Sequence, residues 1–145
     1  MPGIDECLLE AMRLPGARGA ALVDWTSGLA LGSVGEFPGG DPEAAATEAA
    51  EVARLTVEQR AFAPETPDAG AGAGADGDAG AGAGADDPSV EDLIISNRDS
   101  YHLLRFVRTD FDSSVFLHVW LGRRDGNLAL ARIRLEEMAG KLVLG

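Results

Sequence analysis

Two histidines, His102 and His118, carry the only imidazole groups of the chain. Such groups act as general bases or metal ligands near neutral pH, and Asp110 is a nearby carboxylate that could join them in a weak metal site. No His-x-His, His-x-x-x-His or His-Glu-x-x-His spacing is present. His118 also lies inside the apolar run 115–121, which is more typical of a histidine buried in a core or an interface. We therefore expect both histidines to be structural.

The remaining candidate groups form no catalytic set either. Cys7 would need a neighbouring base or cation to become a nucleophile, but Asp5 and Glu6 beside it are acidic, which favours a buried structural thiol. No serine lies in a Gly-x-Ser-x-Gly elbow, and no Walker-type phosphate loop is present. The sequence therefore predicts no enzyme, no cofactor and no metal.

A dinucleotide-binding fingerprint, Gly-x-Gly-x-x-Gly, occurs once, at Gly72, Gly74 and Gly77. This fingerprint binds pyrophosphate only between a strand and a helix, where backbone amides converge. Here it lies inside an Ala-Gly-Asp repeat, among aspartates that would repel phosphate. We interpret the match as a coincidence of composition.

Charge and length restrict the class of protein. The chain has 145 residues, enough for one ordinary domain, and a formal net charge of -12. An acidic surface disfavours nucleic acid and anionic membranes, which attract Lys and Arg. Acidic residues interrupt the first turns, and no apolar run approaches the ~20 residues of a membrane span. We expect a cytoplasmic protein with no nucleic-acid partner and no membrane insertion.

A low-complexity segment divides the chain. Residues 64–88 consist mainly of Ala, Gly and Asp between prolines, and contain six acidic and no basic residues. Such a segment cannot bury enough apolar surface to offset its ordering entropy. The sequence therefore predicts a disordered acidic insertion at 64–88, between a first half-domain at 1–63 and a second half of the same domain at 89–145.

Three segments have helical periodicity. Residues 4–14 place Ile4, Leu8 and Met12 on one face. Asp41 and Pro42 are typical of a helix start, which predicts a helix over 42–62. Asn127 can cap a last helix that extends to about Leu142, with apolar residues every three or four positions.

Five further segments are predicted to be strands: 19–26, 29–34, 90–96, 101–108 and 114–121. The first two form a hairpin across Ser27-Gly28. Short turns between neighbouring strands favour an antiparallel sheet with helices packed on it. The expected class is α+β, in the order α-β-β-α-β-β-β-α.

Two features point to self-association. One helix face carries only small residues, Ala46, Ala50, Ala53 and Val57, over which another backbone can approach closely. Packing of this stripe on the chain's own sheet is the alternative, although Val52, Leu55 and Phe62 on another face can serve the sheet instead. The strand around Asp92, Leu93, Ile94, Ile95 and Ser96 follows the insertion and is expected at a sheet edge. An apolar edge strand is an aggregation hazard that pairing with a second copy would resolve.

This order of elements resembles the Roadblock domain family. The resemblance rests on the hairpin residues 19–24 and 27–32, the Ala-rich helix 42–62, the strands at 90–96 and 101–105, and the start of the last helix at 127–132. It covers about 4–62 and 90–143. It implies a profilin-like five-stranded antiparallel sheet flanked by helices. It also implies a homodimer in which the strand at about 91–96 pairs with its copy and the second helix joins the interface.

The resemblance further implies a function. Roadblock proteins are non-catalytic scaffolds and regulators, and the bacterial ones often act on Ras-like small GTPases in signalling. The Ala- and Gly-rich composition suits an actinobacterium. The long insertion departs from the family, in which this connection is short. An alternative hypothesis is a sensory module that binds a small ligand near Trp25, His118 and Trp120, without a GTPase partner.

Overall fold

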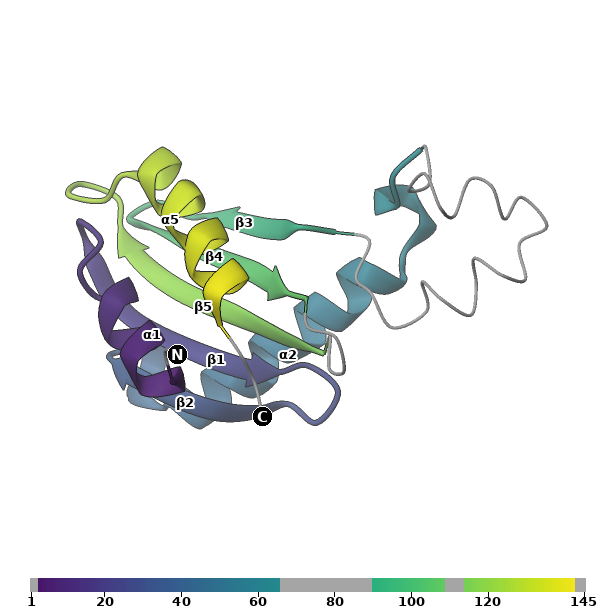
Figure 1. The fold of residues 1–145 in the computed structure, drawn as a ribbon, viewed down its shortest axis with the longest axis horizontal. Coiled ribbons are helices and arrows are strands. Elements are labelled where there is room, and N and C mark those ends of the chain that lie inside the picture. Colours follow the sequence, from purple (N-terminus) through teal and green to yellow (C-terminus); the bar gives the residue numbers. More distant parts are fainter. Residues whose placement is uncertain (1–2, 66–89, 109–113, 143–145) are drawn as a thin grey trace.

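The computed structural model describes residues 3–65, 90–108 and 114–142 (Figure 1). Of the predicted insertion, only Pro64 and Glu65 fall within these residues; the rest lies outside them, as do Asp110 and the three glycines of the fingerprint. The elements are α1 (Ile4–Ala11), β1 (Ala17–Asp24), β2 (Leu29–Gly35), η1 (Pro38–Gly40), α2 (Pro42–Glu58), η2 (Arg60–Phe62), β3 (Asp92–Ser96), β4 (Ser100–Val107), β5 (Val115–Gly122) and α5 (Leu128–Lys141).

The five strands form one antiparallel sheet in the order β2-β1-β5-β4-β3. Helices α1 and α5 cover one face, and α2 lies across the other (Figure 1). The predicted α+β class, the five-stranded antiparallel sheet and the order of the elements are confirmed. Within the described residues, no helix combines the length and apolar character needed to cross a bilayer.

The face under α1 and α5 carries the larger core. Alternate residues of β5, including Leu117 and Leu121, point to this side and pack with Leu8 of α1 and Leu135 of α5. All four side chains are fully buried. Large aliphatic side chains from the helices and the sheet therefore fill this interface. The helices bury this face of β1, β5 and β4.

The face under α2 is packed differently. Its core combines phenylalanines of the sheet, Phe106 and Phe116, with the alanines of the helix, Ala46, Ala50 and Ala53. Small side chains let α2 approach the sheet closely. The helix contacts mainly β2 and β1. Figure 1 shows its C-terminal end and η2 extending beyond the strands.

The expectation that Val52, Leu55 and Phe62 could serve the sheet is wrong. These three side chains are 39%, 50% and 59% exposed. The alanine stripe occupies the inner side of α2 instead, because only small residues fit at this close approach. The larger apolar groups are left on the outer side of the helix.

The predicted helix starts are confirmed at both longer helices. The Asp41 side chain accepts hydrogen bonds from the amides of Glu43 and Ala44, at 3.0 and 3.2 Å. Asn127 accepts one from Leu130, at 3.0 Å. These carboxylate and amide groups satisfy N–H groups that have no partner within the helix.

The helix ends differ from the prediction. α1 ends at Ala11 rather than at 14, and α2 ends at Glu58, followed by the short η2 rather than by continuous helix to 62. Past Ala53, α2 has no buried residue. Tertiary packing supplies most of the stability of a helix in a protein, so the overhanging segment lacks the support to continue.

Candidate functional site

Strand β3 forms one edge of the sheet and, within the part of the chain that the structure describes, pairs with β4 alone. The amide of Phe106 donates to the carbonyl of Glu91, and the amide of Asn97 donates to the carbonyl of Ser100. In an antiparallel ladder, hydrogen-bonded positions alternate. Odd-numbered residues of β3 therefore direct their backbone groups to β4. The even-numbered residues Asp92, Ile94 and Ser96 direct theirs outward, away from the sheet.

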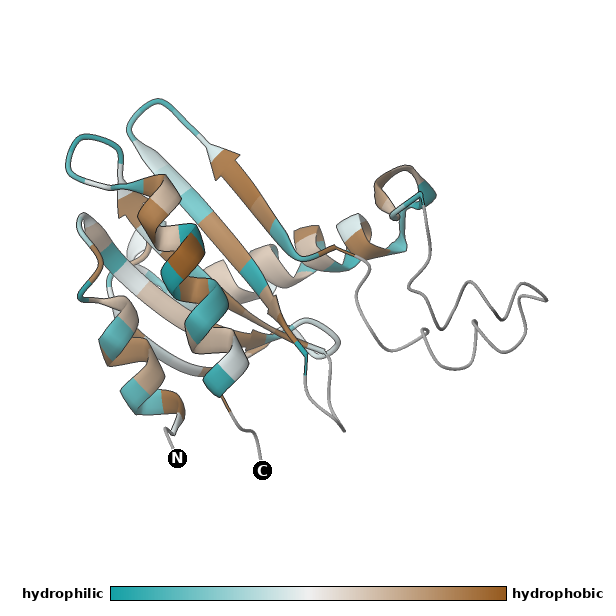
Figure 2. Ribbon diagram, turned by 45° about the horizontal axis from the view of Figure 1, so that its top comes forward, coloured by the Kyte–Doolittle hydropathy of each residue, from teal (hydrophilic) through white to brown (hydrophobic). Residues whose placement is uncertain are grey.

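The side chains of β3 alternate between the two faces. Asp92 lies on the α5 side, where its carboxylate accepts a hydrogen bond from Nε of Arg132 at 2.8 Å. Leu93 packs with the core under α2. Ile94 and Ile95 are 36% and 40% exposed, one on each face. Figure 2 shows the strongly hydrophobic stretch of this strand at the open side of the sheet. β3 is thus an apolar edge whose outward backbone groups have no strand partner among the described residues.

A groove of about 290 Å³ lies beside this edge, between α2 and the uncovered part of the sheet. Its helix wall includes Ala45, Ala49 and Val52, and its sheet wall includes Ile95 and Leu104. Pro38, Glu48, His102 and His118 complete the lining. The groove exists because α2 covers β1 and β2 but leaves the β3–β4 side of the same face open.

The interface residues predicted on α2 are mostly buried inside the protomer, whereas those predicted on β3 lie at the exposed edge of the sheet. Ala46, Ala50 and Ala53 are buried against the chain's own sheet, and Val57 is half-buried beside them. Within the protomer, the exposed side of α2 instead carries Val52 and Leu55. From the sequence, Val52 and Leu55 were expected to pack against the chain's own sheet. Whether α2 joins an interface stays a prediction.

The two histidines lie side by side at the floor of the groove. Nδ1 of His102 and Nε2 of His118 are 2.9 Å apart and share a hydrogen bond. His118 is buried, and burial, followed by the effect of a charge on His102, lowers its pKa to about 3. The prediction that His118 is buried is confirmed.

Aromatic rings extend the pair in both directions. The ring centroids of Phe37 and His118 are 5.4 Å apart. Trp120 stacks on His102, with 6.1 Å between their ring centroids. The guanidinium of Arg18 lies over the Trp120 ring at 5.1 Å. Of the residues predicted to line a ligand pocket, only His118 lines this groove; Trp25 and Trp120 do not.

The other candidate chemistry is absent from the described part of the chain. Cys7 is buried, and burial, together with the charge of Glu10, raises its pKa to about 11, so the thiol is poorly reactive. Among the described residues, no three His, Cys, Asp or Glu side chains converge to hold a metal ion.

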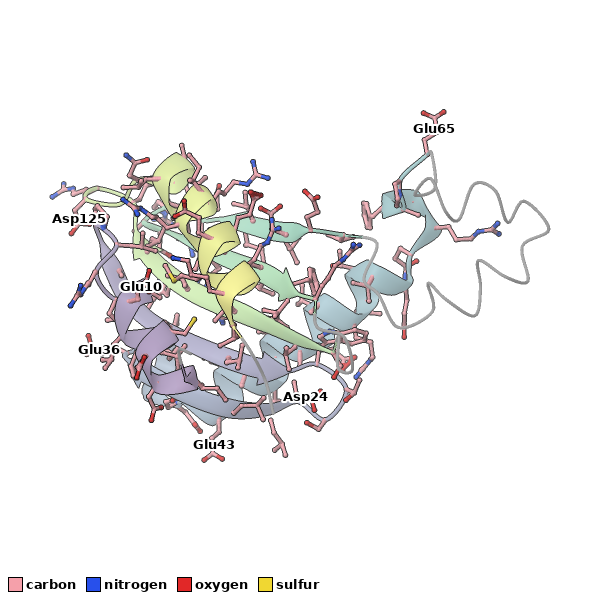
Figure 3. The ribbon with its side chains drawn as sticks, in the orientation of Figure 1. Glu10, Asp24, Glu36, Glu43, Glu65 and Asp125 are labelled. Carbon is pink, nitrogen blue, oxygen red and sulfur yellow. The ribbon has the colours of Figure 1, made fainter. Side chains whose placement is uncertain are left out.

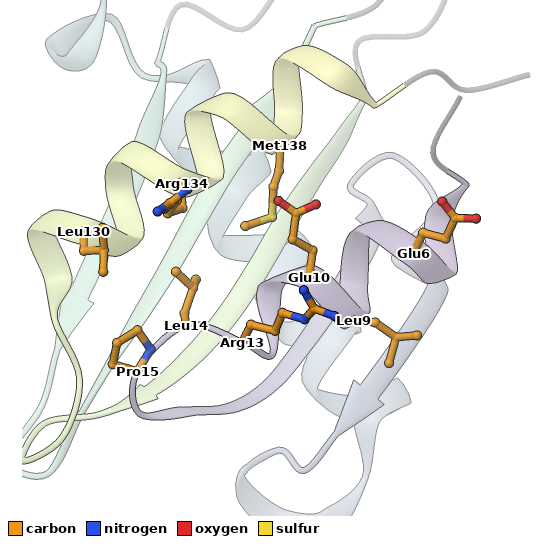
Figure 4. Close-up of a pocket in the computed structure, with 9 residues that line it drawn as sticks. All are labelled: Glu6, Leu9, Glu10, Arg13, Leu14, Pro15, Leu130, Arg134 and Met138. Atoms are coloured by element: carbon orange, nitrogen blue, oxygen red, sulfur yellow. The ribbon is translucent and has the colours of Figure 1, made fainter.

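A larger cleft of about 570 Å³ lies on the opposite face, between α1 and α5 (Figure 4). Its floor includes Leu14 and Met138, and both walls bear charges: Glu6, Glu10 and Arg13 from the α1 side and Arg134 from α5. Charges of both signs, without a convergent polar group, indicate no particular ligand. The acidic side chains labelled in Figure 3 are likewise spread over several elements, and none belongs to β3.

Solved structures with the same arrangement of elements identify the fold. The Roadblock/LC7 domain from Streptomyces avermitilis superposes with a TM-score of 0.62 at 16% identity, over 96% of this chain and 93% of that one. The chain has a Roadblock fold. No family model matches the chain, and no curated protein matches its sequence.

Two further structures share the Roadblock fold. MglB from Myxococcus xanthus has a TM-score of 0.65 at 17% identity, over 94% of this chain and 82% of that one. MglB in a tetrameric arrangement has a TM-score of 0.62 at 18% identity, with the same coverage of 94% and 82%. The identities show a shared fold, and the expectation of this fold from the sequence is confirmed.

Proposed function

We propose that the chain is a non-catalytic homodimeric regulator or scaffold that acts with a Ras-like small GTPase in bacterial signalling. The observation that carries the proposal is the apolar edge of β3 beside an open groove. The Roadblock resemblance of the sequence supplies the GTPase partner, and the tetrameric arrangement of MglB is a precedent for self-association in this fold. We place the protein in the cytoplasm.

The outward backbone groups of β3 define the register of the proposed dimer. An antiparallel pair of identical strands has its two-fold axis at one residue or between two. Only an axis at Ile94 uses all three outward residues, with Ile94 opposite its copy and Asp92 opposite the copy of Ser96. This register allows about six backbone hydrogen bonds. It also keeps the two Asp92 carboxylates apart.

The same register extends the two sheets into one, with both α5 helices on one face and both α2 helices on the other. Leu93 then lies opposite the partner copy of Ile95, on the α2 side. The groove beside Ile95 then faces the second copy, and its helix wall includes the exposed apolar residue Val52. The opposite edge, β2, is less suited to this role, because α1 and α2 both pack against it.

Disulfide trapping tests the register. In a hydrogen-bonded antiparallel pair the two Cα atoms are about 5.5 Å apart, within disulfide range. In a Cys7→Ala background, Ile94→Cys should therefore form a covalent dimer under mild oxidation. Ser96→Cys, on the same strand and face, should not, because its copy lies opposite residue 92. Equal crosslinking of both variants, or of neither, would contradict the register.

The GTPase contact needs a separate experiment. The purified chain is titrated into Ras-like GTPases of the same organism, loaded with GDP or a GTP analogue, in a calorimeter. Saturable binding that prefers one nucleotide state supports a regulator. No binding to any of these GTPases, by a chain that is dimeric by light scattering, would leave the dimer standing and overturn the proposed partner.

A further inference from the structure

His102 occupies a special place in the groove. It lies in the middle of a row of rings, between His118 and Trp120, and it is half-buried, whereas His118 is fully buried. His102 lines the groove together with Ile95 and Val52, the apolar groups that flank the proposed interface. A second copy that fills the groove therefore covers the His102 ring.

The hydrogen bond to His118 determines where His102 can take up a proton. Nitrogens 2.9 Å apart hold one hydrogen between them, so one ring donates and the other accepts. When His102 donates from Nδ1, its Nε2 is left as a free base. A proton added there turns His102 into a cation without breaking the hydrogen bond to His118. The pair thus tolerates one positive charge on His102, the more exposed of the two rings.

We propose that His102 makes self-association dependent on pH, because the groove accepts a second copy only while the His102 imidazole is neutral. This inference rests on the proposed homodimer. A cation enclosed by apolar groups such as Ile95 and Val52 loses its hydration, and the cost is large unless a counter-charge pairs with it.

The charged groups around His102 leave this cost largely uncompensated. From β5, His118 is neutral and supplies only the hydrogen bond. From β1, the Arg18 cation lies over Trp120, on the far side of that ring row. From β3, Ile95 is apolar. Among the described residues, Glu48 of α2 is the one carboxylate that lines the groove, and it is exposed to solvent.

The direction of the pH effect follows from proton linkage. Burial already lowers the pKa of His102 in the single protomer, and covering the groove lowers it further. The separate protomers therefore bind more protons than the dimer, so the dimer weakens as the pH falls through the lowered pKa that His102 has in the separate protomer. Two histidines per dimer set a limit of about a 100-fold change in Kd per pH unit.

Overall charge acts in the opposite direction. The chain has a formal net charge of -12, and two such chains repel each other. Acidification reduces this repulsion and would strengthen a dimer that lacked a titrating group in its interface. A dimer that weakens with acid is therefore diagnostic of a group such as His102.

The test measures the dimer dissociation constant of the full chain by sedimentation velocity between about pH 7.5 and pH 5. The Kd of the wild type should rise at least tenfold from the highest to the lowest pH. Its far-ultraviolet circular dichroism spectrum should not change over this range. His102→Gln, which has no titratable group, should remain dimeric at both ends of the range and show less than about a threefold change. Ser33→Gln, on the opposite edge strand β2 and outside the groove lining, is the matched control and should behave like the wild type.

Each contrary result has a definite meaning. A wild-type Kd that is constant or falls with acid overturns the role of His102 and leaves the dimer standing. A His102→Gln variant whose Kd has the wild-type pH dependence also overturns the role of His102. Acid unfolding of the protomer, in place of dissociation into folded protomers, overturns it as well. A wild type that is monomeric at every pH, at concentrations up to about 100 micromolar, overturns the proposed dimer itself.

Discussion

The two faces of the sheet are covered to different extents. On one face, α1 and α5 cover the strands with large aliphatic side chains such as Leu8 and Leu135, all fully buried. On the other face, a single helix with an alanine stripe covers β1 and β2 and leaves Ile95 and a groove exposed beside it. The first face completes a protomer. The second leaves apolar groups exposed at the edge where we propose a second copy to bind, and substitutions can separate these two roles.

The largest effect is expected in the closed face. Leu135→Ala removes a fully buried side chain from the core under α5. Loss of apolar burial and the cavity left behind should lower the free energy of unfolding by about 2–5 kcal/mol. Urea denaturation at low protein concentration measures it. Ile133→Ala, on the same helix but 59% exposed, should cost less than about 0.5 kcal/mol. Similar losses in both variants would contradict this description of the face.

Proline substitutions in β3 distinguish the contribution of this strand to the stability of the protomer from its contribution to dimerisation. Leu93→Pro removes an amide that the ladder directs to β4, and should lower the free energy of unfolding by about 3 kcal/mol. Ile94→Pro removes only an outward amide, which an edge strand tolerates. It should leave the protomer folded in circular dichroism but reduce the dimer fraction in light scattering. A folded, fully dimeric Ile94→Pro variant would argue against pairing through β3.

The buried histidine makes the stability of the protomer depend on pH. The unfolded chain protonates His118 near pH 6.5, whereas the folded chain holds its pKa at about 3. The unfolded state therefore binds more protons between these values, and stability falls as the pH falls. From pH 7 to pH 5 the loss from this group is about 2 kcal/mol. Urea titrations at both pH values measure it, and His118→Phe should show a correspondingly flatter dependence.

The smallest effect concerns the start of α2. Asp41→Ala removes the side chain that accepts the amide hydrogen bonds of Glu43 and Ala44. Loss of this cap should lower the melting temperature by an amount that corresponds to about 1 kcal/mol. Asp41→Asn keeps an accepting oxygen and should behave nearly as the wild type. Equal destabilisation by both changes would show that charge, rather than the hydrogen bonds, matters at this helix end.

Local chemistry made much of the fold predictable. Asp41 and Asn127 mark helix starts because their side chains accept amide hydrogen bonds from the next turn, an effect confined to a few residues. The alternating strands and the turn at Ser27-Gly28 are local in the same sense. The helix end at Glu58 was less predictable, since it depends on where α2 leaves the sheet.

The candidate site was predictable only in part. The edge position of β3 follows from its place after the insertion and is confirmed. The use of the alanine stripe inside the protomer was not predictable with certainty, because α2 has two apolar faces and periodicity does not say which meets the sheet. The contact between His102 and His118 depends on the pairing of β4 with β5, which places Leu104 opposite His118 and His102 opposite Trp120.

The sequence by itself determined the order and type of the elements and the capped helix starts, because each depends on neighbours within a few positions. Tertiary structure alone decided that alanines face inward, that Val52 and Leu55 face outward and that two histidines share a proton beside an open edge. These features depend on which strands lie side by side and on how close a helix can approach them. Both are properties of packing between residues far apart in the chain.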